Sequence, residues 1–471
     1  MSSNDTAWLR MDSPTNLMMI SGVIVFRQRV DLERLREIIE TRFASFERFR
    51  MRAVRDLTGT WWEPDHDFSI DRHVVPLDVR DDLDQAGLEE LTSRMASTPL
   101  NPDQPMWQFQ LVERFGEGSA MISRIHHCYA DGIALIQVLL SMTDTQPSPA
   151  AATGAPPKRK SRERGLLDQV FHDAQALRDK GADAGKTLLR DGLRLTQRPE
   201  EMLELAGKAT AFATDVARFV LKPPDRRSRY KGKLSPVKRV AWAEPLPLDE
   251  VKAVGKAHGC TVNDVLLSSV AGALRSWATE QGDQIDGLEI HAAVPVNLRP
   301  QVKAGELGNK FGLVFLGIPI GIADAVERLH AVNRKMRELK NSYQAQVSLG
   351  LLSLVGRGPS MLQRPVLEAF SSKATTVMTN VPGPQQPLYL AGAEIDQLLF
   401  WVPQNGRIGI GVSILSYNGK VQFGLIADRN LVPHPGEIIR RVNGQFEELA
   451  LQTMAGHFEG RDHGDDYDEA K

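Results

Sequence analysis

The sequence predicts an α/β protein made of two similar halves. Residues 15–145 alternate short β-prone runs with stretches whose apolar residues recur at helical spacing. The same alternation resumes near residue 237, after a Pro/Ala/Ser-rich segment at 145–157 and a helical pattern over 165–221. We therefore expect a layered α/β (α+β) fold with an N-terminal half at 1–145, a linker with amphipathic helices at 146–236, a C-terminal half at 237–458 and an acidic tail at 459–471.

Length and composition narrow the class of protein. A chain of 471 residues exceeds the usual size of one core, so more than one domain is expected. The 57 basic and 59 acidic side chains leave a formal charge of -2, which gives no overall attraction to nucleic acid. Only two cysteines occur, Cys128 and Cys260, so no disulfide framework is expected and a reducing compartment fits.

The sequence also lacks membrane and export signals. No run of about 18 apolar residues is present, and the first residues do not follow the order of a signal peptide. We therefore expect a cytoplasmic protein without a transmembrane helix.

The first half is predicted to begin with a strand at 15–30 and a helix that Asp31 caps and that runs to Phe43. A second helix is expected around 85–95. The alternating strand 105–112 then leads into a short strand at 120–125, and the apolar run 133–140 predicts a buried helix.

The second half repeats this plan, which suggests a duplication. Helices are expected from residue 248 and from 261 to about 277. Strands are expected at 239–242, 289–297, 313–320, 375–379, 395–401, 409–416 and 419–427.

The linker contains two stretches with competing interpretations. Residues 181–187 look like a phosphate-binding loop, but the spacing is one residue short and no strand precedes it, so we exclude a nucleotide site. Residues 186–198 form a basic amphipathic pattern, which suits either a membrane surface or packing on the protein. Packing on the protein is the simpler interpretation.

Two adjacent histidines, His126 and His127, stand where a predicted strand meets a predicted helix. Imidazole titrates near neutrality and can act as a general base there. Two simpler interpretations stay open on these residues alone. The first is a metal site, although neighbours on extended chain point to opposite faces and no further His/Cys cluster is present. The second is an ordinary turn shaped by Asp131 and Gly132.

Other polar residues have structural and chemical interpretations of equal standing. Thr261 and Asp264 fit a helix capping box, which explains both, whereas Asn263 between them is free to point into a cleft. Ser413 and Ser416 lie near a probable hairpin, where a hydroxyl can donate to an oxyanion or belong to the turn. No G-x-S-x-G sequence occurs, which argues against a serine hydrolase of the α/β type.

Several motifs together resemble a known family. The chain is similar to the bacterial wax ester synthase/acyl-CoA:diacylglycerol acyltransferases, within the CoA-dependent acyltransferase superfamily. The matching stretches are Ser13–Met18, Pro105–Trp107, the His-His-x-x-x-Asp-Gly motif at 126–132, Asn263–Asp264, Pro295–Arg299, Asn380–Pro384 and Leu388–Gly392.

The resemblance implies two chloramphenicol-acetyltransferase-like domains in tandem with a tunnel between them. Acyl-CoA would be the donor substrate, diacylglycerol or a long-chain alcohol the acceptor, and no cofactor or metal would be needed. His127 would take the proton of the acceptor hydroxyl, which attacks the thioester directly without an acyl-enzyme. His126 would support the loop and Gly132 its geometry, while Asp131 would be structural and pair with Arg299 of the second half.

The remaining candidates follow from the same resemblance. Asn263, Ser413 and Ser416 are candidate stabilisers of the oxyanion, and Pro105, Trp107 and Tyr129 are candidate substrate contacts. Tyr129 stands at a position where small residues are frequent in the family, so we expect it to narrow the tunnel. The sequence does not choose between the two acceptors and gives neither acyl chain length nor oligomeric state.

Two other function classes compete with this one. One is a condensation-type transferase whose acyl donor sits on a carrier protein, although the chain contains no carrier domain. The other is a non-catalytic protein that lies on a lipid surface through residues 165–221. Attachment at the inner membrane face or at lipid inclusions is compatible with the transferase as well.

Overall fold

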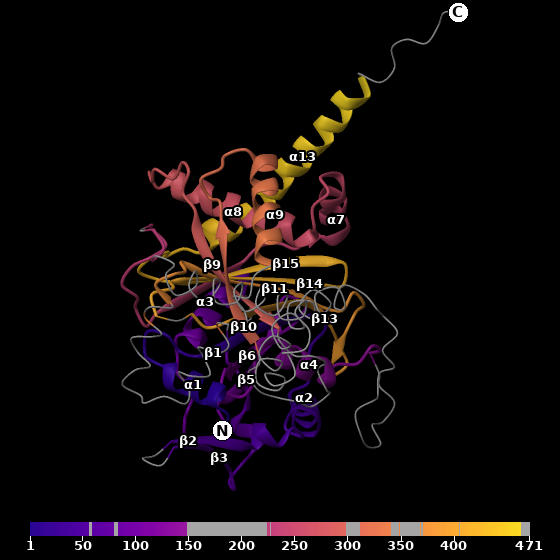
Figure 1. Ribbon diagram of the computed structural model, residues 1–471. Helices are drawn as coiled ribbons and strands as arrows, with labels where there is room; N and C mark the ends of the chain where they lie inside the picture. The colour runs from indigo at the N-terminus through magenta and orange to yellow at the C-terminus, as the bar shows by residue number, and fades with distance from the viewer. Residues whose placement is uncertain are drawn as a thin grey trace, which may run out of the picture.

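Two β-sheets with helices packed on them make up the protein in the computed structural model (Figure 1), which confirms the predicted α/β class. The structure describes residues 1–55, 59–79, 83–147, 224–226, 228–297, 311–340, 348, 368, 371–404 and 406–462. The predicted linker helices at 165–221 and most of the acidic tail lie outside these residues. Helix α13 (Arg441–Asp462) points away from the body and continues into the first residues of the predicted tail (Figure 1).

The N-terminal sheet has the strand order β12-β13-β1-β6-β5-β4. Its central strand β1 is buried along its whole length, and β6 pairs with it antiparallel so that Met19 lies opposite His126. The strands are β1 (Met19–Phe26), β4 (Val74–Pro76), β5 (Trp107–Phe115), β6 (Gly118–His126), β12 (Tyr389–Leu390) and β13 (Ala393–Trp401). A separate hairpin consists of β2 (Met51–Arg55) and β3 (Thr60–Pro64).

The C-terminal sheet has the strand order β10-β9-β11-β14-β15-β7, with β8 beside β15. Its strands are β7 (Lys238–Trp242), β8 (Leu246–Pro247), β9 (Ile290–Asn297), β10 (Phe311–Ile318), β11 (Thr376–Pro382), β14 (Ile410–Tyr417) and β15 (Lys420–Asp428). Within the described residues, five helices pack with it in one continuous core: α7 (Leu248–Ala257), α8 (Val262–Glu280), α9 (Ala325–Lys340), α12 (Gly436–Ile439) and α13.

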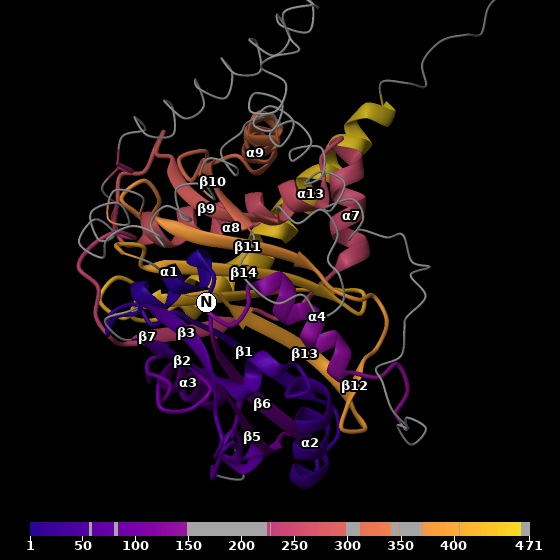
Figure 2. The same ribbon diagram turned by 60° about the horizontal axis from the view of Figure 1, so that its bottom comes forward.

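Two described strands from the C-terminal part of the chain, β12 and β13, join the N-terminal sheet. Strand β13, which follows β11 in the chain, does not join the C-terminal sheet but pairs antiparallel with β1, where Val23 lies opposite Leu399 (Figure 2). Strands β12 and β13, which lie within the C-terminal half predicted at 237–458, therefore belong to the N-terminal sheet. The apolar alternation of 395–401 correctly indicates a strand, but it carries no information about which sheet supplies the partner.

Helix ends follow the local chemistry of the sequence. Asp31 caps α2 (Leu32–Ile38) by accepting the Arg34 amide, as predicted. Thr261 and Asp264 form the predicted reciprocal capping box at the start of α8. Helix α1 (Ser3–Met11) was not predicted; Ser2 caps it by accepting the Asp5 amide at 3.1 Å.

A third hydrophobic cluster lies between the two sheets. It joins Val23 and Val25 of β1 to Val240 and Trp242 of β7, with α3 (Gln85–Ala96) at its edge. At its border, Glu89 of α3 accepts the Trp242 amide and receives two bonds from Arg440, at 3.0 and 2.8 Å. Because apolar burial is the main stabilising term in folding, this cluster fixes how the halves meet. None of the helices that the structure describes is both long and apolar enough to cross a bilayer.

Candidate active site

The histidine motif occupies the turn between β6 and α4 (Gly132–Met142). Both histidine amides are bound to the chain on either side: His126 N–H donates to Met106 O at 2.9 Å and His127 N–H to Met18 O at 2.7 Å. The turn is thus fastened to the residues that lead into β5 and β1. A side chain placed on such a turn has a fixed origin, which suits a reacting group.

His127 is buried and lies under an aromatic ring from α1. Its imidazole stacks on the indole of Trp8, with ring centroids 3.9 Å apart and an interplanar angle of 15°. The side chains are 4% and 7% exposed, respectively. One face of the predicted base is therefore covered by the protein itself, so a substrate must approach at the edge or at the other face.

His126 has a different environment. Its Nδ1 accepts the Cys128 amide at 3.2 Å, which assigns the proton of the neutral ring to Nε2. That Nε2 lies 3.8 Å from an Asp12 carboxylate oxygen, and the same oxygen accepts the Met18 amide at 2.6 Å. This geometry supports the predicted bracing role of His126.

Asp131 is the N-cap of α4 and accepts the Ala134 amide at 2.9 Å. Its carboxylate is 3% exposed. Arg299, its predicted partner, lies outside the described residues, so that pairing stays a prediction. A Cβ at Gly132 would meet no described atom within 4 Å, and the residue is not in the left-handed region. The protein packing therefore gives no support for the predicted need for glycine there.

The predicted substrate contacts Pro105, Trp107 and Tyr129 are buried in the N-terminal half, and their contact with substrate stays a prediction. Trp107 is 0% exposed, stacks on His73, and its Nε1 donates to Phe49 O at 2.8 Å. Tyr129 is also 0% exposed; its hydroxyl donates to Met51 O at 2.7 Å and accepts the Met106 amide at 3.1 Å. Because both the donor and the acceptor function of the Tyr129 hydroxyl are satisfied, this side chain supports the histidine turn.

Burial also sets the acid–base properties of this core. Desolvation raises the pKa of the Tyr129 hydroxyl well above its ordinary value, and it raises the pKa of the neighbouring Cys128 thiol as well. Both groups are therefore neutral at physiological pH, and a thiolate nucleophile at Cys128 is disfavoured.

The polar candidates of the second half lie near one another on α8, β11 and β14. Asn263 Oδ1 accepts a bond from Asn380 of the Asn-Val-Pro-Gly-Pro sequence at 2.8 Å, and its Nδ2 has a weak contact with Met336 Sδ at 3.9 Å. Ser416 accepts from Gln385 at 3.2 Å, whereas the Ser413 hydroxyl has only a long bond of 3.5 Å to Gly424 O. Among these, Asn263 has the amide N–H groups that are least committed to the protein.

Trp8 and Asp12 were missed as site residues because α1 was not predicted. The signal was present: Ser2 and Asp5 have the spacing of a helix start, and Ala7, Trp8 and Met11 lie at helical spacing behind them. The helix is only two and a half turns long, which weakens any periodicity.

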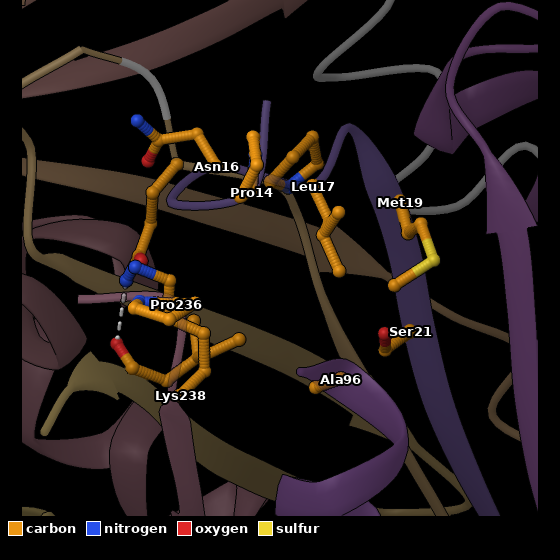
Figure 3. Close-up of a pocket in the computed structure, with 11 residues that line it drawn as sticks. Pro14, Asn16, Leu17, Met19, Ser21, Ala96, Pro236 and Lys238 are labelled. Atoms are coloured by element: carbon orange, nitrogen blue, oxygen red, sulfur yellow. Dashed lines mark hydrogen bonds between the residues drawn. The ribbon is translucent and has the colours of Figure 1, made fainter. Parts of the chain in front are cut away.

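A pocket lies close to the histidine motif, on the face of β1 that points away from Trp8 (Figure 3). Met19 and Ser21 point into it, while Ile20 and Ile24 pack with Trp8 in the N-terminal core. Its empty volume is ≈ 350 Å³, part of it open to solvent. Neither Trp8 nor His127 lines this pocket, so the predicted tunnel past His127 stays a prediction. No three His, Cys, Asp or Glu side chains converge around a metal position in the described part of the chain.

Comparison with known families identifies the chain. The sequence matches the wax ester synthase/diacylglycerol acyltransferase catalytic domain over residues 1–266 and the WS/DGAT C-terminal domain over residues 307–450. The chain belongs to the wax ester synthase/diacylglycerol acyltransferase family. This confirms the resemblance drawn from the motifs, and it makes the protein an acyltransferase of this type.

Relatives from mycobacteria align over most of the chain. The probable diacylglycerol O-acyltransferase tgs2 of Mycobacterium tuberculosis is 28% identical over 479 residues, which cover 95% of this chain and 98% of the relative. The probable diacylglycerol O-acyltransferase tgs1 of the same organism is 26% identical, with 87% of this chain and 84% of the relative covered.

Solved structures share the fold. The wax ester synthase/diacylglycerol acyltransferase from Marinobacter aquaeolei VT8 superposes with a TM-score of 0.65 at 20% identity, covering 96% of this chain and 98% of that one. The first condensation domain of the calcium-dependent antibiotic synthetase gives 0.56 at 15% identity, with 96% and 95% covered. These likenesses concern the fold alone, and they confirm the predicted chloramphenicol-acetyltransferase-like architecture.

Proposed function

We propose that this acyltransferase moves a fatty acyl group from acyl-CoA to diacylglycerol, to a long-chain alcohol, or to both. The names of the two mycobacterial relatives favour diacylglycerol, and the name of the Marinobacter protein includes both acceptors. The observation that carries the proposal is the position of His127, which is buried on a fastened turn with one face of its ring covered by Trp8.

The proposed reaction needs no cofactor and no acyl-enzyme. His127 takes the proton from the acceptor hydroxyl as its oxygen attacks the thioester carbonyl carbon. The tetrahedral oxyanion then collapses, the carbon–sulfur bond breaks, and the CoA thiolate receives the proton from the imidazolium. General-base catalysis of this kind contributes about 10²–10⁴ in rate.

For the oxyanion we favour Asn263 over the two serines. Asn380 holds the Asn263 carbonyl oxygen at 2.8 Å and thereby fixes where its amide nitrogen points. A donor that is oriented before the reaction loses no free energy to reorganisation, and one such donor is typically worth about 10²–10³ in kcat. Ser416 is engaged by Gln385 and is the weaker candidate.

The test is a side-by-side acceptor assay with purified full-length protein. Palmitoyl-CoA is supplied with either dioleoylglycerol or hexadecanol in mixed micelles, and the released CoA thiol and the lipid product are both measured. We expect CoA release that depends on acceptor, with a matching triacylglycerol or wax ester. Absence of release across a broad panel of hydroxyl acceptors would contradict the proposal.

The two competing classes have their own outcomes in this assay. Turnover of acyl groups only when they are attached to a carrier protein would favour the condensation-type reaction. Lipid binding that is unchanged by His127→Ala, with no turnover in either protein, would favour a non-catalytic surface protein. We place the reaction at a lipid surface, with the protein attached peripherally, because both proposed acceptors partition into lipid.

A further inference from the structure

We propose that Trp8 is a positioning residue for His127: its indole face orients the imidazole and stabilises the ring while it carries the proton. The inference rests on the proposed role of His127 as the base. It adds a residue from the N-terminal helix α1, outside the His-His-x-x-x-Asp-Gly motif, to the machinery of proton transfer.

The geometry is that of a stacked pair in a closed environment. The ring centroids are 3.9 Å apart and the planes differ by 15°, so the two faces are in van der Waals contact over most of the imidazole. Both side chains are more than nine-tenths buried. Rotation of the His127 ring about its Cβ–Cγ bond would drive its edge into the indole, so Trp8 restricts the ring to one plane.

Trp8 is itself held in place because α1 is anchored on the hairpin β2–β3. The N-terminal ammonium of Met1 donates to Thr60 O at 3.2 Å, and the Thr6 and Thr60 hydroxyls are 2.6 Å apart. At the other end of the helix, Asp12 accepts the Met18 amide at 2.6 Å. Side chains locked by such supporting contacts hold a reacting group in its productive geometry.

The stack also has an electrostatic consequence. The face of an indole carries negative quadrupolar charge, which attracts a cation placed over it and is strongest when water is excluded. Neutral imidazole gains little from this attraction, whereas the imidazolium formed on proton transfer gains an estimated two- to thirty-fold in stability. The indole therefore favours the state in which His127 has accepted the proton.

The charged and titratable groups around the pair come from several elements. Asp5 of α1 is buried and lies 3.6 Å from Arg48, which also donates to Tyr129 O. Asp12 faces His126, and Asp131 caps α4 on the far side of the turn. Replacement of Trp8 leaves all of these charges in place, so a difference between wild type and a Trp8 variant reports the ring alone.

Two substitutions in the full-length enzyme test the proposal. Trp8→Leu removes the aromatic face, and Trp8→Phe keeps a smaller one. We expect Trp8→Leu to lower kcat about three- to thirty-fold with a smaller change in KM, and Trp8→Phe to fall between it and wild type. The limb of the kcat/KM profile on which the base becomes protonated should move to lower pH in Trp8→Leu, because the protonated ring has lost a stabilising partner.

Trp277→Phe is the matched control. Trp277 is buried in the C-terminal core, where its Nε1 donates to Glu437 at 3.0 Å, so its replacement disturbs packing without touching His127. It should change stability and leave the pH limb in place. A folded Trp8→Leu variant with the wild-type kcat and pH limb would overturn the proposal.

A spectroscopic readout separates this proposal from the proposed function. Protonated imidazole quenches the fluorescence of an indole stacked on it. The difference in emission between wild type and Trp8→Phe should therefore fall as His127 is protonated, and His127→Gln should abolish that titration. If the titration is present but His127→Gln retains activity, the proposed base is wrong and the coupling stands. If the titration is absent in active enzyme, the coupling is wrong and the base stands.

Discussion

His126 and His127 are neighbours in the chain, yet their side chains lie in different surroundings. The ring of His126 is tied to backbone through the Cys128 amide and lies near Asp12, on the face of β1 that carries Met19. The ring of His127 lies against Trp8 on the side of the N-terminal core. The two rings therefore lie in different environments: His126 accepts a backbone hydrogen bond within the turn, whereas His127 is stacked on an indole.

The most direct test of this difference between the two histidines is to replace His127. We expect His127→Ala to lower kcat about 10²–10⁴-fold, because the acceptor proton no longer has a base. Alanine keeps the backbone bond to Met18 O, so the turn stays fastened, while loss of the buried ring that stacks on Trp8 should lower the unfolding midpoint moderately. Activity is measured by CoA release and folding by circular dichroism. A loss of activity that merely tracks a loss of fold would remove the distinction between the two histidines.

Replacement of His126 should lower the stability of the protein more than it lowers kcat. In His126→Ala the buried Cys128 amide loses its acceptor, which costs about 1–3 kcal/mol of stability. His126→Asn places an oxygen near the former Nδ1 and should recover part of that cost. Urea denaturation gives the free energies, and kcat should fall less than tenfold in the folded fraction. An Asn variant as stable as wild type but as inactive as His127→Ala would reverse the two roles.

A third prediction concerns Tyr129, whose side chain supports the histidine turn. Tyr129→Phe removes the hydroxyl that joins Met51 O to the Met106 amide, so we expect about 1–3 kcal/mol of destabilisation. The ratio of activity with hexadecanol to activity with dioleoylglycerol should stay at its wild-type value. A changed ratio in a protein of unchanged stability would support Tyr129 as a substrate contact.

The smallest effect on the free energy of unfolding is expected at Asp131, near the end of the motif. Asp131→Ala removes the N-cap of α4 and should cost about 0.5–2 kcal/mol. Asp131→Asn keeps a capping oxygen and removes the charge, so it should cost less than alanine. An asparagine variant that is as unstable as the alanine variant would instead point to the predicted ion pair with Arg299, which Arg299→Gln can then test.

Most helices and strands and the histidine motif could be predicted from the sequence. The contacts between segments that are far apart in the chain could not. Short runs rich in apolar and β-branched residues correctly indicated strands such as 105–112 and 409–416, because strand propensity and length are local properties. The pairing of β13 with β1 depends on two segments about 370 residues apart, where no local pattern applies. The burial of the Tyr129 ring depends on the fold as well, because the family motif gives the position of the residue but not the side of the turn its ring occupies. Trp8 was missed for the same reason, since only the folded chain brings α1 over His127.

Strand β13 also sets an order of events during synthesis. The edge of β1 next to β13 has no backbone partner until the ribosome has released residue 401, long after β1, β5 and β6 have emerged. All eight residues of β1 are buried in the finished protein, so the nascent chain exposes an apolar strand edge of the kind that templates wrong pairing. Closure of so long a loop is slow. Yield in a foreign host should therefore depend on chaperone supply and on translation speed through the C-terminal half more than on the stability of the mature enzyme.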